Sequence, residues 1–237
     1  MRLSKVLGVR RIKIRNRIFS LGIIITGMLS LTFGVITFYG QNAGNMIMSV
    51  DPSAALRGIK LSDDPDLSSP FTSTRLMSEP IEDAKDITYA WVKRGEVHET
   101  MGNFVDEDHD YVAYTFYVKN DGAETVDLRY YIKITEVYKN LDKGIRVILI
   151  DNGEESFYMK ADSTNETYYP SSMPVAEHFV SSSIVMRRTI ANFKPGDIRK
   201  ISVIVYLEGY DPDTNDDLMG GMIKLQMVFT IDEKFNE

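Results

Sequence analysis

The polar stretch from Glu208 to Asp217 (EGYDPDTNDD) holds the residues whose types and spacing best suit a ligand. Its acidic and amide side chains alternate at Asp211, Asp213 and Asn215, as the first ligands of an oxygen-rich calcium loop do. Calcium is bound by several carboxylate and carbonyl oxygens that converge from one flexible loop. The pattern therefore predicts a calcium site, with the candidate ligands Glu208, Asp211, Asp213, Asn215 and Asp217.

The same stretch departs from a calcium loop at two positions. Counted from Asp211, the place of the sharp-turn glycine holds Asp216, and the twelfth place holds Met222 instead of a bidentate glutamate. The alternative interpretation is an acidic loop between two strands, with Asx turns and an exit through Gly220 and Gly221. Calcium is the one cofactor that the sequence suggests.

Residues for catalysis are present without a recognisable spacing. No second histidine accompanies His98 at the distance that places two imidazoles on one helical face. His109 lies in the acidic run DEDHD, and His178 stands alone. The chain has no Gly-x-Ser-x-Gly elbow, and nothing singles out a glycosidase pair among its 34 acidic residues. We expect that the protein is not an enzyme and keep a hydrolase as an alternative.

The element that must position everything else is the uncharged stretch Ile18–Tyr39. A helix of this length spans about 33 Å, close to the hydrocarbon thickness of a bilayer. Seven basic residues precede it within residues 1–17, and the first acidic residue is Asp51. The asymmetry predicts a single-pass protein of the cell membrane, with residues 1–17 in the cytoplasm, the bilayer as a partner and the C-terminal domain outside.

Two interpretations of the apolar stretch remain. A cleaved signal peptide has an apolar region of about 7–15 residues, shorter than this one. The nearest cut would follow Ala43, with Gln41 in a place that favours a small residue, so an uncleaved signal-anchor fits better. Ser30 and Gly34 stand four apart and could seat a partner helix.

Composition excludes several classes of function. The chain has no cysteine, which excludes a disulfide framework, a thiolate zinc site and a thiol nucleophile. Residues 18–237 carry 20 basic and 34 acidic side chains. A surface this acidic repels nucleic acid and is compatible with cations and cationic polymers.

The pattern of the part expected to be exported, residues 40–237, predicts β structure. Residues 40–85 combine an exit loop, an expected strand Asn45–Val50, a possible second strand Ala55–Leu61 and a Ser/Asp/Pro-rich linker. Residues 86–237 are expected to form an extracellular sandwich, which strand 45–50 can join. Because parallel strands need long crossovers and no helical period is evident there, we predict an all-β fold, an antiparallel β-sandwich or jelly roll. The expected strands are Ile87–Val92, Tyr111–Val118, Val126–Val137, Ile145–Ile150, Phe157–Lys160, Ile184–Phe193, Ile198–Leu207 and Met222–Ile231.

Three blocks of sequence resemble a known group of proteins: YGQNAGN with GIKLS, YVAYTFYVKNDG, and FKPGD through VYLEGYDPD to the glycine pair. They are similar to exported β-sandwich proteins of the Firmicute and Mollicute type, a largely uncharacterised group distantly similar to camelysin and TasA-like surface proteins. The resemblance implies a jelly-roll domain at the cell surface and, in part, assembly of biofilm matrix fibres. It implies no catalytic residue in this chain.

Three hypotheses of different classes follow. The first is a non-enzymatic, membrane-anchored module that acts in surface structure, adhesion or matrix assembly. Its partners would be a cell-surface polymer or further copies of the chain, which strand Asn45–Val50 could join by strand addition. The second is a calcium- or carbohydrate-binding surface module built on the Glu208–Asp217 loop. The third is a hydrolase, which requires a cleft with a close carboxylate pair.

Overall fold

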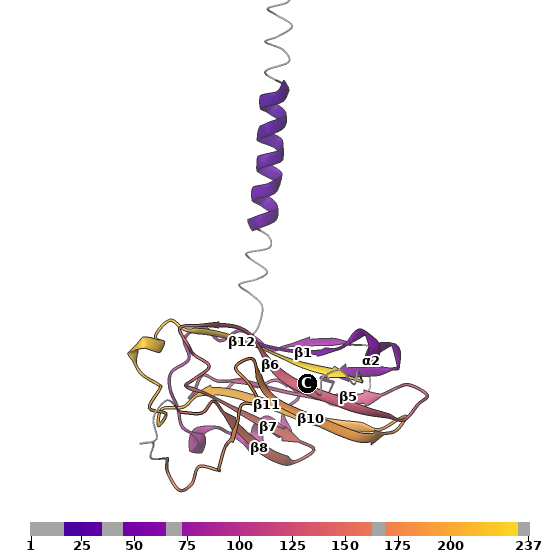
Figure 1. Ribbon diagram of the computed structural model, residues 1–237, viewed down its shortest axis with the longest axis vertical. Helices are drawn as coiled ribbons and strands as arrows, with labels where there is room; N and C mark the ends of the chain where they lie inside the picture. The colour runs from indigo at the N-terminus through magenta and orange to yellow at the C-terminus, as the bar shows by residue number, and fades with distance from the viewer. Residues whose placement is uncertain (1–16, 35–44, 65–72, 163–168, 232–237) are drawn as a thin grey trace, which may run out of the picture. The chain divides into compact units, whose positions relative to one another are not determined.

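The structure is a computed structural model that describes residues 17–34, 45–64, 73–162 and 169–231. The chain divides into two compact units, Met1–Ala43 and Gly44–Glu237 (Figure 1). Most of the basic N-terminal segment, the predicted exit loop and residues 65–72 of the expected linker lie outside the described residues.

The first unit contains one helix, Arg17–Gly34, which is long and apolar enough to cross a membrane. Its 18 residues span about 27 Å at the usual rise of an α-helix. The apolar side chains cover every side of it and are all exposed, with Ile23 and Leu31 each at 71%. A helix that is apolar all round needs apolar surroundings. Residues 35–39 of the predicted span lie outside the described residues.

The second unit consists of two mixed sheets, and strands are its main secondary structure (Figure 1). The first sheet has the order β10-β6-β12-β1-β3, and the second has β2-β5-β11-β7-β8-β9 with β4 paired to β5. The strands of the first sheet are β1 (Met46–Val50), β3 (Arg75–Met77), β6 (Val126–Tyr138), β10 (Ile184–Phe193) and β12 (Met222–Thr230). Those of the second are β2 (Ile59–Ser62), β4 (Gly102–Asn103), β5 (Val112–Asn120), β7 (Ile145–Asp151), β8 (Glu154–Met159), β9 (Glu177–His178) and β11 (Ile198–Leu207).

The expectation of purely antiparallel sheets is wrong. Strand β1 runs parallel to β12, with Met48 opposite Met227, and β8 runs parallel to β9. The sequence argument required a crossover helix between parallel neighbours. The β1–β12 pair needs none, because nearly the whole domain lies between the two strands and returns the chain to the correct end.

Two further expectations are corrected by short helices. The segment predicted as strand Ala55–Leu61 begins in helix α2 (Pro52–Leu56), because Asp51 accepts a hydrogen bond from the Ser53 amide and Pro52 occupies the first turn. The expected strand Ile87–Val92 makes one parallel bridge at Ile87 and then the 3-10 helix η1 (Tyr89–Trp91). Helix α3 (Arg94–Glu99) follows it, and η2 (Asp216–Leu218) lies in the β11–β12 loop.

Side chains from both sheets share one hydrophobic cluster. Phe116 of β5 meets Phe229 of β12 edge to face, with ring centroids 5.9 Å apart, and Tyr130 of β6 stacks on Phe229. Burial of these rings and of the aliphatic side chains around them is the main stabilising contribution.

The second sheet is also buried on its other face. Strand β7 has seven buried residues in a row, with Val147 and Leu149 in the shared cluster and Ile148 and Ile150 in a second one. That second cluster is completed by Val92 and Val97 from the segment that carries η1 and α3. A strand covered on both faces explains why every residue of the run IRVILI except Arg146 is apolar.

Candidate functional site at the β11–β12 loop

The predicted calcium residues lie in the loop between β11 and β12, and they divide into two groups. Glu208, Asp211 and Asp213 are buried, whereas Asn215 and Asp217 are exposed. The backbone of Ile87 holds the start of the loop, because its amide donates to Leu207 and its carbonyl accepts from Gly209. The exposed pair ends the loop, where the Asn215 side chain accepts from the Asp217 amide and caps η2.

The centre of the buried group is Arg146, a residue that the sequence reasoning missed. Arg146 stands in β7 directly opposite Tyr206 of β11, beneath the loop. Its Nη1 lies 2.7 Å from Oδ2 of Asp211, and neither side chain has any exposed surface. Its Nη2 donates to the hydroxyl of Tyr169 at 2.7 Å, and that hydroxyl donates to Asp162 at 2.9 Å. One guanidinium therefore ties the loop after β11 to the segment after β8.

Glu208 is a second carboxyl in this network and has no exposed surface. It accepts hydrogen bonds from the Tyr206 hydroxyl at 3.0 Å and from the Tyr210 amide at 3.1 Å. Burial raises the pKa of Glu208 above the ordinary carboxyl value, although these bonds and Arg146 oppose the rise. Burial likewise raises the pKa of Asp211 against the opposing charge of Arg146. The arrangement therefore places two carboxyl groups with raised pKa values near one positive charge, that of Arg146.

These positions do not gather calcium ligands. A calcium ion requires six to eight converging oxygens. Here Oδ2 of Asp211 faces a guanidinium, Oδ1 accepts from the Asp213 amide at 2.7 Å, and Glu208 is bound to a tyrosine. Within the described part of the chain, no three His, Cys, Asp or Glu side chains are placed to hold a metal ion. The residues present do not fit the ion in this arrangement, and the calcium site stays a prediction.

The three histidines lie in separate places. His98 of α3 has Nδ1 2.8 Å from the hydroxyl of Ser202 in β11, while His178 lies in β9. His109 stacks on Trp91 with ring centroids 5.1 Å apart.

The His98–Ser202 contact does not make Ser202 a nucleophile. The Thr115 hydroxyl lies 2.7 Å from the carbonyl of Val97, which can only accept, so Thr115 donates its one proton there. In the 2.8 Å contact between the two hydroxyls, Thr115 therefore accepts and Ser202 donates. Ser202 has then used its one proton, so Nδ1 of His98 must donate to the Ser202 oxygen. In this assignment the imidazole cannot take a proton from Ser202, which is fully buried.

A further polar group joins the two sheets near β10. Arg188 of β10 donates to the Tyr158 hydroxyl at 2.9 Å and to Ser156 at 2.8 Å, both on β8. Tyr130 of β6 donates to Asp151 of β7, which also binds Arg199. Every member has a partner in the protein, which is typical of a structural network.

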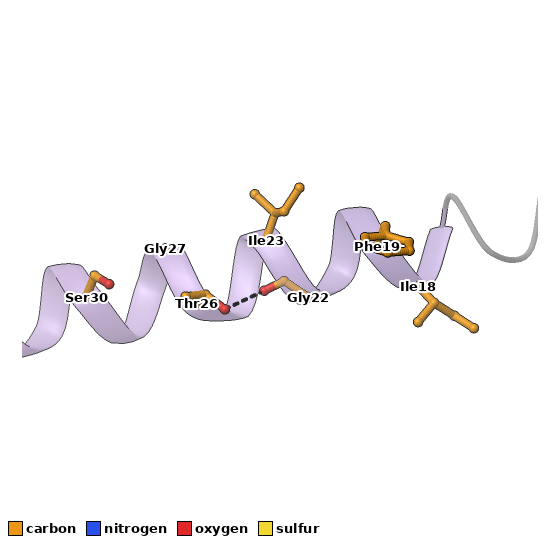
Figure 2. A pocket seen from close by; sticks show the side chains of 7 residues that line it. All are labelled: Ile18, Phe19, Gly22, Ile23, Thr26, Gly27 and Ser30. Carbon is orange, nitrogen blue, oxygen red and sulfur yellow. Dashed lines mark hydrogen bonds between the residues drawn. The ribbon is translucent and has the colours of Figure 1, made fainter.

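The apolar helix of the first unit carries a groove along one side. Four small residues and three larger ones line this open groove (Figure 2), formed by Ile18, Phe19, Gly22, Ile23, Thr26, Gly27 and Ser30. The Thr26 hydroxyl donates to the Gly22 carbonyl at 2.9 Å, so the helix satisfies this polar group by itself. A side chain added at Gly22 or Gly27 would meet nothing within 4 Å.

The fold and these contacts define a mostly β domain of two mixed sheets, preceded in the sequence by one helix able to cross a membrane. No protein-family model matches the chain, and no curated protein matches it. Among solved structures, a β-glucosidase from Kluyveromyces marxianus in complex with glucose matches 74% of this chain at 15% identity, with a TM-score of 0.24. This chain covers 16% of the length of that protein, and a similarity this low carries no conclusion about fold or activity.

Proposed function

We propose that the protein is a membrane-anchored extracellular β-sandwich, of jelly-roll type, with a non-enzymatic role in surface structure, adhesion or matrix assembly. The observation that carries the proposal is the order of the two units along the chain, an apolar helix followed by a β domain. An apolar helix ends its described part at Gly34, and a buried strand, β1, begins at Met46. The basic segment before the helix and the acidic domain after it support a cytoplasmic N-terminus.

The role of β1 makes the assembly hypothesis specific. Met46 and Met48 of β1 are fully buried, so the sheet needs this strand. On its outer side β1 is paired with β3 over only three residues, Ile47 to Ser49. A strand that fills a sheet and is lightly covered on one side can come from the same chain or from a neighbour. Strand exchange between copies would then link anchored molecules at the surface.

The anchor is tested by the intact mass of the protein extracted from membranes. A retained helix gives 26.9 kDa for the whole chain. A single lighter species that begins after Ala43 would show a released domain and contradict the anchor.

Strand exchange is tested separately with engineered cysteines, because the chain has none of its own. Ile47 and Gln226 lie opposite each other in the β1–β12 pair, so Ile47→Cys with Gln226→Cys can form a disulfide. Exchange predicts a ladder of disulfide-linked multimers on a non-reducing gel of surface extracts, and Ile47→Cys alone is the control. Only monomers with an internal disulfide would refute exchange and leave the anchor untouched.

A further inference from the structure

An exposed tryptophan, Trp91, lies on the segment that covers the second sheet, and the half-buried ring of His109 stacks on it. Trp91 is the only tryptophan of the chain and keeps 54% of its surface exposed. The His109 ring lies almost parallel to the indole, at an angle of 11°. Val92 and Val97, which follow Trp91 in the sequence, pack into the second cluster, so covering the sheet does not require the indole of Trp91.

The loop that carries His109 is fixed in place. Lys93, two residues after Trp91, binds Asp106 at 2.8 Å and Asp108 at 3.2 Å. The Tyr111 hydroxyl also donates to Asp106 at 2.8 Å. Trp91 and His109 are thus held by contacts on both sides of the stack, and a ligand would meet a surface that is already ordered.

The charge around the pair is negative. The run from Asp106 to Asp110 has four carboxyl groups, and Lys93 supplies one positive charge to two of them. Glu107 and Asp110 are exposed and form no ion pair with the described residues. A small cation near the indole would therefore find unpaired carboxylates within the same short loop.

A comparison within the same segment indicates what the indole lacks. The ring of Tyr89 is covered by Arg94, whose Cζ lies 3.7 Å from the ring centroid. Across the parts of the chain that the structure describes, no cationic side chain lies over Trp91. Tryptophan is the strongest cation–π acceptor among the side chains.

We infer that Trp91 and His109, with Glu107 and Asp110 of the loop that carries His109, bind an organic ammonium ion. Either a quaternary amine or the ammonium group of a lysine side chain has this chemistry. The indole face takes the cation and its methylene or methyl groups, and the carboxylates supply the countercharge. The inference does not depend on the anchor or on strand exchange.

The single tryptophan makes the test direct. The full chain in a neutral detergent is titrated with choline, and separately with an Nα-acetyl-lysine amide, while Trp91 fluorescence is recorded. Sodium chloride at equal ionic strength and the uncharged choline analogue 3,3-dimethylbutan-1-ol are the controls. We expect a saturable change with a dissociation constant on the order of millimolar for at least one ammonium ligand, because exposed cation–π contacts are individually weak. The two ligands distinguish a free quaternary amine from a lysine side chain as the source.

Two variants assign the binding to these residues. Glu107→Gln with Asp110→Asn should raise the dissociation constant by about fivefold. Glu124→Gln removes an exposed carboxyl after the far end of β5 and should change nothing. In Trp91→Ala, the saturation-transfer NMR signal of the choline methyl groups should disappear.

The inference is overturned if neither ammonium ligand changes the emission beyond the sodium chloride control. It is equally overturned if the uncharged alcohol binds as well as choline, or if Trp91→Ala retains the choline signal.

Discussion

Replacement of Arg146 by methionine is the sharpest test of the buried network. Methionine is comparably long and keeps most of the packing, but it removes the ion pair with Asp211 and the hydrogen bond to Tyr169. The Asp211 carboxyl would then stay buried with the Asp213 amide as its remaining hydrogen-bond donor. Breaking a buried pair on one side costs about 3–5 kcal/mol, because an uncompensated charge remains.

That cost is large enough to measure by thermal unfolding. For a domain of this size, 1 kcal/mol corresponds to about 2–4 °C in melting temperature, so we expect Arg146→Met to lower it by about 10 °C. The full chain is heated in neutral detergent, and near-ultraviolet circular dichroism follows the transition.

A double-mutant cycle separates the ion pair from simple loss of packing. Asp211→Asn keeps the oxygen that accepts from the Asp213 amide and leaves Arg146 without its anion, so it should destabilise as Arg146→Met does. The double variant removes both charges and should be more stable than the sum of the single effects predicts. Additive effects, or an Arg146→Met variant that melts within about 2 °C of the unmodified chain, would refute this account of the network.

Three further predictions address neighbouring features. Burial raises the pKa of Glu208 above 4.5, so the folded state binds this proton more tightly than the unfolded chain does, and the group lowers stability as pH rises above 4.5. Glu208→Gln should therefore flatten the profile of melting temperature against pH in that range. Parallel profiles for the variant and the unmodified chain would contradict the raised pKa. A Cβ at Gly122 would lie 1.9 Å from the Arg57 carbonyl oxygen, so Gly122→Ala should cost about 3 kcal/mol or more in denaturant unfolding. Gly95→Ala lies in α3 and meets nothing within 4 Å; it is the control and should leave stability unchanged or raise it by up to about 1 kcal/mol. Since Asp211 faces Arg146, calorimetry with millimolar calcium should show no heat of binding, and the melting temperature should not change. A saturable heat of binding that Asp217→Asn abolishes would support the predicted calcium site instead.

Much of the strand pattern could be predicted from local sequence signals. The run Ile145–Ile150 forms β7 because five of its six residues are apolar and it ends at Asn152 and Gly153, which both have positive φ angles. The pairing of strands was harder to predict. Strands β1 and β12 are neighbours in the sheet although nearly the whole domain separates them in the sequence, and no local pattern encodes that contact. Helix α2 was missed because the cap at Asp51 and Pro52 outweighed the apolar residues after it.

The candidate site was predicted only in its location. The alternation of acidic residues identified the loop as a candidate site. A carboxylate that pairs with a cationic side chain and one that binds a metal ion cannot be distinguished in the sequence. The available signal was Arg146 itself, because a charged side chain inside a strand buried on both faces must have a buried partner. That rule requires an acid nearby, and the 34 acids of the chain offer no way to choose Asp211 before the fold is known.

The two acidic loops of the domain therefore differ in what their carboxyl groups can do. In the β11–β12 loop, Glu208 and Asp211 face inward and are held by Tyr206 and Arg146, so their role is to fix the loop to the sheet. In the run before β5, Asp106 is the buried anchor, and Glu107 and Asp110 remain exposed in the loop whose His109 stacks on the exposed Trp91. Charge that already has an internal partner contributes little to a ligand, whereas unpaired charge next to an ordered apolar surface contributes both attraction and contact area. A ligand of this domain is consequently to be sought at Trp91, and the loop that resembles a calcium site is better regarded as part of the framework.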